Sequence, residues 1–375
     1  MIDWLPIVVL PNAQMREPLE MENVALCPPS DMRVIAAIAQ HPRLGIFLDK
    51  FTDAFGQKIS PAVLLVREGT PEIYRTTAAI GGFRDAMAAS TLTSGRAVLV
   101  SHSASMRRPI WAECLSFYPW MIDRNGTYLI ANTPSMMGMH HVDEFRGQSF
   151  AGFSPNEIGQ SDIDGPLFSQ LSLRWTSRFR EEDVSWEDRA LFRSLNMAYQ
   201  ACMMPGGLEA AFYDVGRLIS LWVSACEILV HPGPGGGSGK TQVMDILDCA
   251  DWCSELLKIK SEQVGGKKQM ARTVASALYF RIDSLRSSFL HGNEVDQSEL
   301  LTESGVHLLH VAACIYRVLL TTRLEVHRPQ FEENSEFNER RFVNEFAAYC
   351  DWKDAQRRHE RAILKAAGLD SLSDK

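Results

Sequence analysis

The sequence contains no cysteine pair with C-x-x-C spacing, although it has eight cysteines among its 375 residues. Zinc sites and thioredoxin-like redox sites commonly use that spacing. Only Cys249 and Cys253 lie four residues apart, which predicts one face of a helix rather than a zinc site. The cysteines therefore indicate a reduced, cytoplasmic protein, and we predict neither a bound metal nor a cofactor.

Long apolar runs are also missing. The opening segment, MIDWLPIVVLPNAQ, lacks the basic region and the apolar length of a signal peptide. The longest apolar run elsewhere, LISLWVSACEILV, is too short to span a bilayer and contains Glu227. We therefore predict a protein that does not enter the membrane.

An excess of positive charge is absent as well, because 38 Lys and Arg residues face 46 Asp and Glu residues, for a net charge of -8. This balance argues against a protein that coats nucleic acid over its whole surface. Residues 258–286 depart from it, with seven basic residues (Lys258, Lys260, Lys267, Lys268, Arg272, Arg281, Arg286) against Glu262 and Asp283, or +5. A solvated helix face and an RNA-binding surface both account for this segment. The RNA interpretation selects Lys267, Lys268, Arg272 and Arg281.

The N-terminal part has the pattern of a mixed α/β domain, which we assign to residues 1–152. Residues 4–10, 61–66 and 96–100 are short apolar runs bounded by proline, glycine or charge, which predicts buried strands. Asn125-Gly126 separates two aromatic or β-branched runs, which predicts a β-hairpin with a type I′ turn. The segments 31–55 and 81–90 have helical character.

The C-terminal part is helical in pattern, and residues 153–170, polar and rich in turn formers, are the expected linker before it. Ser185 is a predicted N-cap. Amphipathic periodicity continues through 185–204, 207–230, 241–259, 269–290 and 298–324. We expect a helical domain over 171–330 and a charged helix within 331–375. The predicted fold class is α+β, with a mixed α/β domain followed by an all-α bundle.

A glycine-rich stretch, HPGPGGGSGKT (residues 231–241), ends like a phosphate-binding P-loop. A Walker A loop has the pattern G-x-x-x-x-G-K-[ST]. If Gly239 and Lys240 were its second glycine and its lysine, its first glycine would fall at position 234, which holds Pro234. A P-loop also follows a strand, whereas the preceding residues have helical periodicity. We therefore disfavour a P-loop NTPase and interpret the stretch as a loop between two helices.

A second motif, R-x-x-x-x-H, stands at the end of a predicted amphipathic helix. Arg286 and His291 are the motif residues, and Gly292 is expected to end the helix directly after the histidine. The simplest structural interpretation is that Arg286 pairs with Asp283 at i−3 while His291 caps the helix. The functional interpretation is a site in which both side chains act on a phosphate.

Residues 171–325 resemble the HEPN superfamily, and within it the ApeA-like HEPN domains of prokaryotic defence and abortive-infection proteins. The resemblance lies in Leu221-Trp222, Glu227, the variable loop, Arg286-Ser287 with His291-Gly292, and a closing helix near 303–323. It implies an endoribonuclease for anti-phage defence or a toxin-like abortive-infection response. Arg286 and His291 would be catalytic, with Glu227, Ser287 and Asn293 in support. It further implies a homodimer with a composite active site.

The residue types agree with RNA cleavage that needs no metal. A histidine can act as base or acid near neutral pH, and an arginine fork matches a phosphate and stays charged. One histidine cannot perform both proton transfers at once, so a two-fold dimer would supply the second. The N-terminal domain would sense a trigger, such as a phage-derived molecule or a partner protein, or restrain the nuclease.

Two alternatives stay open. Many HEPN nucleases carry Asn, Asp or His after the motif arginine, whereas this chain has Ser287. That departure favours a non-catalytic HEPN module that dimerises or binds nucleic acid or nucleotide. The P-loop NTPase is the third hypothesis.

Other histidines are weaker candidates. The HHVDE segment at 140–144 has metal-ligand residue types without a further cluster to complete a site. His307 and His310 share an apolar helix face, which is typical of core histidines. His102 lacks the strand-turn-helix setting of a serine-hydrolase motif.

Overall fold

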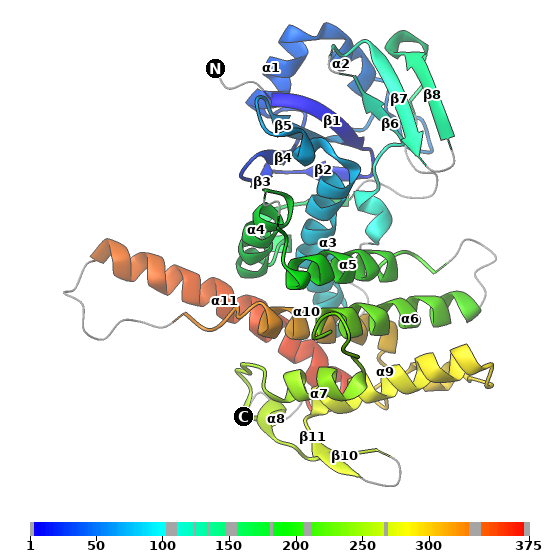
Figure 1. Cartoon of the computed structure of the whole chain (residues 1–375), viewed down its shortest axis with the longest axis vertical. Helices are drawn as coiled ribbons and strands as arrows, with labels where there is room; N and C mark the ends of the chain where they lie inside the picture. Colours follow the sequence, from blue (N-terminus) through cyan, green and yellow to red (C-terminus); the bar gives the residue numbers. More distant parts are fainter. Residues whose placement is uncertain are drawn as a thin grey trace. The chain divides into compact units, whose positions relative to one another are not determined.

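The computed structural model describes residues 4–102, 111–123, 125–133, 136–147, 156–180, 183–205, 212–265, 269–329 and 339–370. The chain forms two compact units and is of the α+β class (Figure 1). The first unit comprises residues 1–84, 112–162 and 179–181, and the second comprises 85–111, 163–178 and 182–375. Residues 85–111, which we assigned to the N-terminal domain, thus belong to the helical unit.

An antiparallel sheet organises the first unit, in the strand order β1 (Trp4–Leu10), β5 (Ala62–Arg67), β4 (Val24–Cys27), β3 (Leu19–Met21). The predicted strands at 4–10 and 61–66 are confirmed as β1 and β5. Helices α1 (Met32–Gln40) and α2 (Pro42–Leu48) follow, and they confirm the helical prediction for that region. Phe47 and Phe51 pack edge to face at 5.1 Å in a cluster that includes Val63 and Leu65 of β5.

The predicted hairpin is confirmed, but its turn is of another kind. Strands β6 (Trp120–Ile122) and β7 (Tyr128–Thr133) pair antiparallel, and β8 (Met136–His141) continues the sheet. Gly126 has a φ of +64°, and Asp123 N–H donates to the Tyr128 carbonyl at 2.9 Å, so four residues separate the paired strands instead of the two of a type I′ turn. The Asp123 carboxylate instead holds a longer loop by accepting hydrogen bonds from the backbone N–H groups of Thr127 (2.5 Å) and Tyr128 (2.7 Å).

The expected linker at 153–170 contains regular structure. Strand β9 (Asn156–Ile158) pairs in parallel with β2 (Ala13–Met15), and helix α4 (Gly165–Arg180) begins before the linker ends. Asp164 caps this helix by accepting a hydrogen bond from Leu167 N–H at 3.2 Å. Polar composition alone therefore did not distinguish a linker from a short strand and a helix start.

The predicted strand at 96–100 is wrong, because these residues form part of helix α3 (Thr77–Ser101). Much of α3 is buried around its circumference, so its sequence lacks amphipathic periodicity, and a short apolar run within it looks like a buried strand. Its hydroxyls bond to the helix itself. Ser90, Thr91 and Thr93 each donate to the carbonyl four residues earlier.

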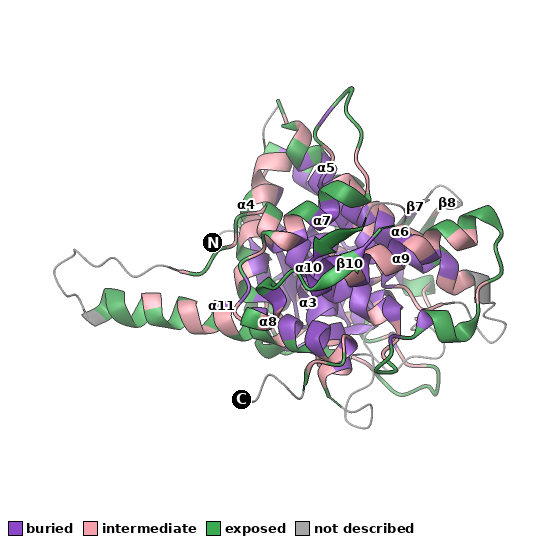
Figure 2. Ribbon diagram, turned by 90° about the horizontal axis from the view of Figure 1, so that it is seen from below, coloured by how far each residue is buried: buried purple, intermediate pink, exposed green. Residues whose placement is uncertain are grey.

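Most of the second unit is a helical bundle around α10 (Leu308–Arg323), which is buried along nearly its whole length. Figure 2 shows the buried residues gathered about α10 and α3. The surrounding helices are α5 (Trp186–Ala201), α6 (Phe212–Leu229), α7 (Lys240–Asp248), α8 (Glu255–Lys258), α9 (Val274–His291) and α11 (Glu339–Ala366). Ser185 is the N-cap of α5, as predicted, and accepts a hydrogen bond from Asp188 N–H at 3.1 Å.

Three details of the bundle differ from the predicted helices. The helix expected over 298–324 begins only at Leu308, after a short 3-10 helix at Gln297–Leu300. The helix expected over 241–259 ends at Asp248, so Cys249 and Cys253 do not share a helix face. Residues 270–272, expected to be helical, form strand β11 (Met270–Arg272), paired with β10 (Glu262–Val264). Short strands of this kind are hard to predict from sequence, because hydrogen bonds to the partner strand stabilise them and the short segment has little pattern of its own.

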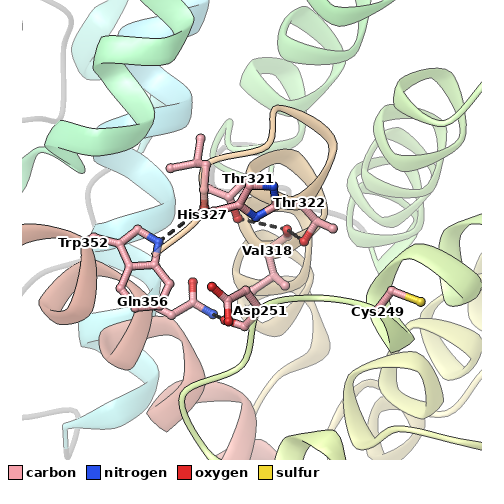
Figure 3. A pocket seen from close by; sticks show the side chains of 9 residues that line it. Cys249, Asp251, Val318, Thr321, Thr322, His327, Trp352 and Gln356 are labelled. Atoms are coloured by element: carbon pink, nitrogen blue, oxygen red, sulfur yellow. Dashed lines mark hydrogen bonds between the residues drawn. The ribbon is translucent and has the colours of Figure 1, made fainter. Parts of the chain in front are cut away.

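A buried polar network links α4, α10 and α11. Arg317 and Asp164 are both fully buried and joined by a 2.8 Å hydrogen bond, and Arg317 also donates to Gln356. Gln356 donates to the backbone carbonyl of Asp251 at 3.3 Å beside a small cavity of about 50 Å³, where Trp352 also lies (Figure 3). His359 is buried next to this network on α11.

Stability is expected to fall as the solution is acidified, because His359 is held neutral. Burial, together with the charge of Arg317, lowers the pKa of His359 to about 3. In the unfolded chain His359 takes up a proton below about pH 6.5, whereas in the folded chain it stays neutral. Its contribution to stability is therefore fully present above that pH and is lost as the pH falls below it. For this residue alone we expect a loss of about 1.4 kcal/mol between about pH 7.5 and pH 5.5.

Urea denaturation at both pH values measures this loss. His359→Gln removes the titrating group, so its free energy of unfolding should change less between the two pH values than that of the wild type. An identical pH dependence in both proteins would contradict the assignment.

Candidate catalytic site at the end of helix α9

Helix α9 carries the R-x-x-x-x-H motif, and both of its ends are defined by specific hydrogen bonds. At the start, Thr273 caps the helix, and the Asp248 carboxylate accepts from Thr273 N–H (3.1 Å) and from the Ser276 hydroxyl (2.7 Å). At the end, Gly292 has a φ of +72°, and Asn293 N–H donates to the Ser288 carbonyl at 3.0 Å. This is a Schellman ending, which suits glycine. The helix therefore ends at His291, as predicted.

A glycine allows α6 to approach this part of α9 closely. A Cβ atom on Gly216 would lie 2.6 Å from the ring of Phe289, so no larger residue fits without a shift. Farther along α6, Trp222 is buried against Tyr316 of α10, with ring centroids 5.5 Å apart. Trp222 of the Leu221-Trp222 pair thus anchors α6 in the core, and α6 places Glu227 beside α9.

Arg286 has two acidic neighbours, and these are the two that sequence reasoning named. Its Nη2 atom lies 3.9 Å from Glu227 Oε2, and its Nη1 atom lies 3.6 Å from Asp283 Oδ1. Both separations exceed those of direct hydrogen bonds, and among the residues that the structure describes the buried Arg286 Nε has no hydrogen-bond partner. The Arg286 side chain is 32% exposed. The guanidinium is therefore positioned by charge while it keeps donors that can bind an anion.

A second cation, Lys240, joins the group from the glycine-rich segment. Lys240 Nζ lies 3.3 Å from Asp283 Oδ2 and 4.7 Å from the centre of the Phe280 ring. Sequence reasoning did not assign Lys240 to this site, because 46 positions separate it from Arg286 and no local pattern connects them. The cluster therefore pairs Lys240 and Arg286 with Glu227 and Asp283.

The side chains of Glu227 and Tyr279, which border Arg286, are poorly solvated. Burial raises the pKa of Glu227, and the positive charge of Arg286 opposes this shift. Burial also raises the pKa of Tyr279, whose hydroxyl finds no hydrogen-bond partner in the described part of the chain. In such surroundings the attraction between Arg286 and an anion is screened less than it would be at an open surface.

His291 is exposed at the end of α9. Five residues of an α-helix turn through about 500°, so His291 and Arg286 diverge by about 140° around the axis and are about 7.5 Å apart along it. Ser287 lies one turn before His291 and is also exposed, as is Asn293 beyond the helix end. One copy of α9 therefore directs its arginine and its histidine to different sides.

The four predicted RNA contacts have different outcomes. Lys267 and Lys268 lie outside the described residues. The prediction for Arg272 is wrong, because it is 4% exposed and pairs with Asp245 (2.6 Å) and Asp248 (3.0 Å). Arg281 donates to the backbone carbonyls of Glu299 (3.2 Å) and Leu301 (2.5 Å), so it holds the short helix η5 (Gln297–Leu300). Arg272 and Arg281, two of the seven basic residues in segment 258–286, thus stabilise the fold.

The glycine-rich stretch connects two helices, as predicted. Helix α6 precedes it, and Gly239 is the N-cap of α7. Gly233 and Gly235 have φ values of +125° and +82°, which L side chains rarely adopt. No strand leads into the loop, and its lysine is engaged by Asp283.

The remaining histidine candidates take part in local contacts. His140 pairs with Glu144 at 3.3 Å, and His141 lies 2.6 Å from Arg43 Nη1. Within the part of the chain that the structure describes, no three His, Cys, Asp or Glu side chains are grouped to hold a metal ion. His307 caps α10 by accepting from Leu309 N–H. Burial lowers the pKa of His310 to about 3.

Across the described ranges, no helix combines the length and apolarity that a membrane crossing needs. No family model, curated protein or solved structure compared with this chain matches it.

Proposed function

We propose that this protein is a metal-independent endoribonuclease of the HEPN type, with Arg286 and His291 as its catalytic residues. The observation that carries the proposal is how Arg286 is placed among its acidic neighbours and how far it is exposed. Its guanidinium is held 3.9 Å from Glu227 and 3.6 Å from Asp283, is one third exposed, and keeps donors for a phosphate. A protonatable side chain, His291, stands at the exposed end of the same helix.

The chemistry is an in-line transfer within the RNA strand. The 2′-hydroxyl oxygen attacks the adjacent phosphorus while its proton passes to a neutral His291, and Arg286 binds the non-bridging oxygens. The bond from phosphorus to the 5′-oxygen breaks, and a protonated histidine donates a proton to that oxygen. The products are a 2′,3′-cyclic phosphate and a 5′-hydroxyl.

A second copy of the chain completes this scheme. Arg286 and His291 of one helix point about 140° apart, and the reaction needs two histidines in opposite protonation states. A two-fold axis near the end of α9 would place the arginine of each copy near the histidine of the other. Leu290, which is 61% exposed beside His291, would be covered by such a contact.

The biological setting follows from the HEPN resemblance. We propose a role in anti-phage defence or abortive infection, in the cytoplasm. The N-terminal unit would bind a trigger or restrain cleavage, with a phage-derived molecule or a partner protein as the activating signal.

The test is cleavage of a mixed RNA pool in EDTA by the wild type, by Arg286→Ala and by Arg281→Ala. Arg281 lies on the same helix but bonds to backbone carbonyls, so it serves as the matched control. Cleavage should be lost only in Arg286→Ala, and the product ends should be 2′,3′-cyclic phosphates. Equal cleavage by all three proteins, or dependence on added Mg²⁺, would contradict the proposal.

Ser287 favours the alternative of a non-catalytic HEPN module, since it stands where many HEPN nucleases carry Asn, Asp or His. RNA binding without turnover, weakened in Arg286→Ala, would support that alternative. The P-loop hypothesis instead requires Mg²⁺-dependent ATP binding that is lost in Lys240→Ala. We expect no such binding, because Lys240 is paired with Asp283.

A further inference from the structure

Lys240, at the end of the glycine-rich stretch, takes no part in the cleavage chemistry proposed for Arg286 and His291. It is the first residue of α7, and α7 packs against α9 (Figure 1). Its Nζ atom lies 3.3 Å from Asp283 Oδ2, whereas Arg286 Nη1 lies 3.6 Å from the other oxygen, Asp283 Oδ1. One carboxylate therefore holds two cations from different helices, one at each of its oxygen atoms.

The acidic side chains of this cluster are more buried than its basic ones. Asp283 and Glu227 are only 9% and 20% exposed, whereas Lys240 and Arg286 are 45% and 32% exposed. An anion that approaches from the solvent therefore meets the two cations before the two carboxylates. The carboxylates hold the cations in place from the protein side and leave their outer sides accessible.

Lys240 keeps hydrogen-bond donors for a ligand. A lysine ammonium has three N–H groups. Among the residues that the structure describes, Asp283 is its ion-pair partner, and one oxygen at 3.3 Å can engage one of these groups. The Phe280 ring, 4.7 Å away, holds the ammonium against α9 by a cation–π contact. The remaining N–H groups can bind a phosphate.

The two cations lie on opposite sides of Asp283 around α9. Arg286 follows Asp283 by three residues, which places it about 60° around the axis in one direction. Phe280, which Lys240 covers, precedes Asp283 by three residues and lies about 60° around the axis in the other direction. The cations are thus displaced from each other both along the helix and around it. This arrangement suits two successive phosphates better than two oxygens of the same phosphate.

We propose that Lys240 binds the RNA phosphate next to the one that Arg286 binds. This inference rests on the proposed function, and it adds a requirement to the substrate, because a strand that uses both contacts needs a second phosphate beside the cleaved bond. It also gives the glycine-rich stretch a role, which is to present this lysine to the RNA backbone. Contacts of this kind add affinity without reading the base sequence.

Binding of a short, fluorescein-labelled single-stranded RNA in EDTA tests this contact. Each protein also carries His291→Ala, so that the RNA stays intact, and fluorescence anisotropy is measured over a range of salt concentrations. Lys240→Gln should raise the dissociation constant about threefold to fivefold at low salt. The slope of log affinity against log salt should fall by about 0.7, the contribution of one phosphate contact to a single strand. Lys240→Arg keeps the charge and should keep the slope.

Lys260 provides the matched control. It is 51% exposed, and its Nζ atom also lies 3.3 Å from the oxygen of a buried carboxylate, Asp248 Oδ2. Asp248 accepts a hydrogen bond at the start of α9, so this ion pair lies far from Arg286. Lys260→Gln removes the same charge and should leave the slope unchanged. An equal effect of both glutamine substitutions would show a general effect of charge and would overturn the inference.

Cleavage of two minimal substrates, without the His291→Ala change, separates the neighbouring phosphate from the cleaved one. A dinucleoside monophosphate has a single phosphate, whereas a trinucleoside diphosphate has two. Lys240→Gln should lower kcat/KM about threefold to fivefold for the trinucleotide only, and Arg286→Ala should abolish cleavage of both. If Lys240→Gln slowed both substrates equally, the lysine would act at the cleaved phosphate, contrary to the inference.

The two assays distinguish failure of the inference from failure of the proposed function. If Lys240→Gln changed neither binding nor cleavage while Arg286→Ala reduced both, the inference would be wrong and the proposed function would stand. If the wild type cleaved neither substrate but the salt dependence of RNA binding still required Lys240, the nuclease would be wrong and the contact would stand. A wild type that neither bound nor cleaved RNA would overturn both.

Discussion

Replacing Arg317 by methionine is expected to lower the free energy of unfolding by about 3–5 kcal/mol. Arg317 and Asp164 are fully buried, and the substitution leaves the Asp164 carboxylate without its cation. Burial raises the pKa of this carboxyl, but Arg317 and its neighbours outweigh that effect and hold the pKa of Asp164 below its ordinary value. Urea denaturation followed by circular dichroism measures the loss.

A second substitution separates the charge from the packing. Asp164→Asn removes the negative charge while its side-chain oxygen still accepts from Leu167 N–H at the start of α4. The double variant Arg317→Met/Asp164→Asn should therefore recover much of the stability lost in Arg317→Met alone. A loss below about 1 kcal/mol in the single variant would show that Asp164 is stabilised without Arg317, contrary to this account.

Replacing His291 by alanine is expected to slow RNA cleavage by about 100- to 10,000-fold, the contribution usual for a positioned acid or base. The stability of the fold should change little, because His291 is exposed and the Gly292 ending of α9 uses backbone groups only. Single-turnover cleavage of a labelled RNA in EDTA measures the rate, and thermal melting checks the fold.

His102→Ala is the matched control, since His102 is also an exposed histidine near a helix end. Its cleavage rate should equal that of the wild type. Unchanged cleavage in His291→Ala would remove this residue from the mechanism, and Arg286 would then need another proton-transfer partner.

Features that depend on neighbouring residues could be predicted from the sequence. Ser185 caps α5, and Gly292 ends α9 in the left-handed conformation, because capping involves only a few consecutive residues. The hairpin around Asn125-Gly126 was predictable for the same reason. Its turn type was not, because the Asp123 carboxylate competes for the loop N–H groups.

Features that depend on burial were harder to predict. Residues 96–100 are helical although their apolar run suggests a strand, because burial of α3 removes the pattern that distinguishes the two. Strand β9 and the start of α4 escaped detection because their sequence is polar. In both cases the deciding contacts come from residues far away in the chain.

The candidate site shows the same division. The helix, its end after His291 and the pairing of Arg286 with Asp283 follow from spacing along one segment. The approach of Lys240 and the burial of Arg272 depend on how α7 packs against α9, which no local pattern records.

The sequence by itself determined the α+β class, most of the helices and the motif at the end of α9, because backbone hydrogen bonding and capping act over a few residues. Only the tertiary structure decided which charges serve the fold and which face outward. Arg272 and Arg317 are as basic in sequence as Arg286, but carboxylates from distant segments neutralise them in the interior. Arg286 keeps a partly exposed guanidinium because its acidic neighbours lie beyond hydrogen-bonding distance.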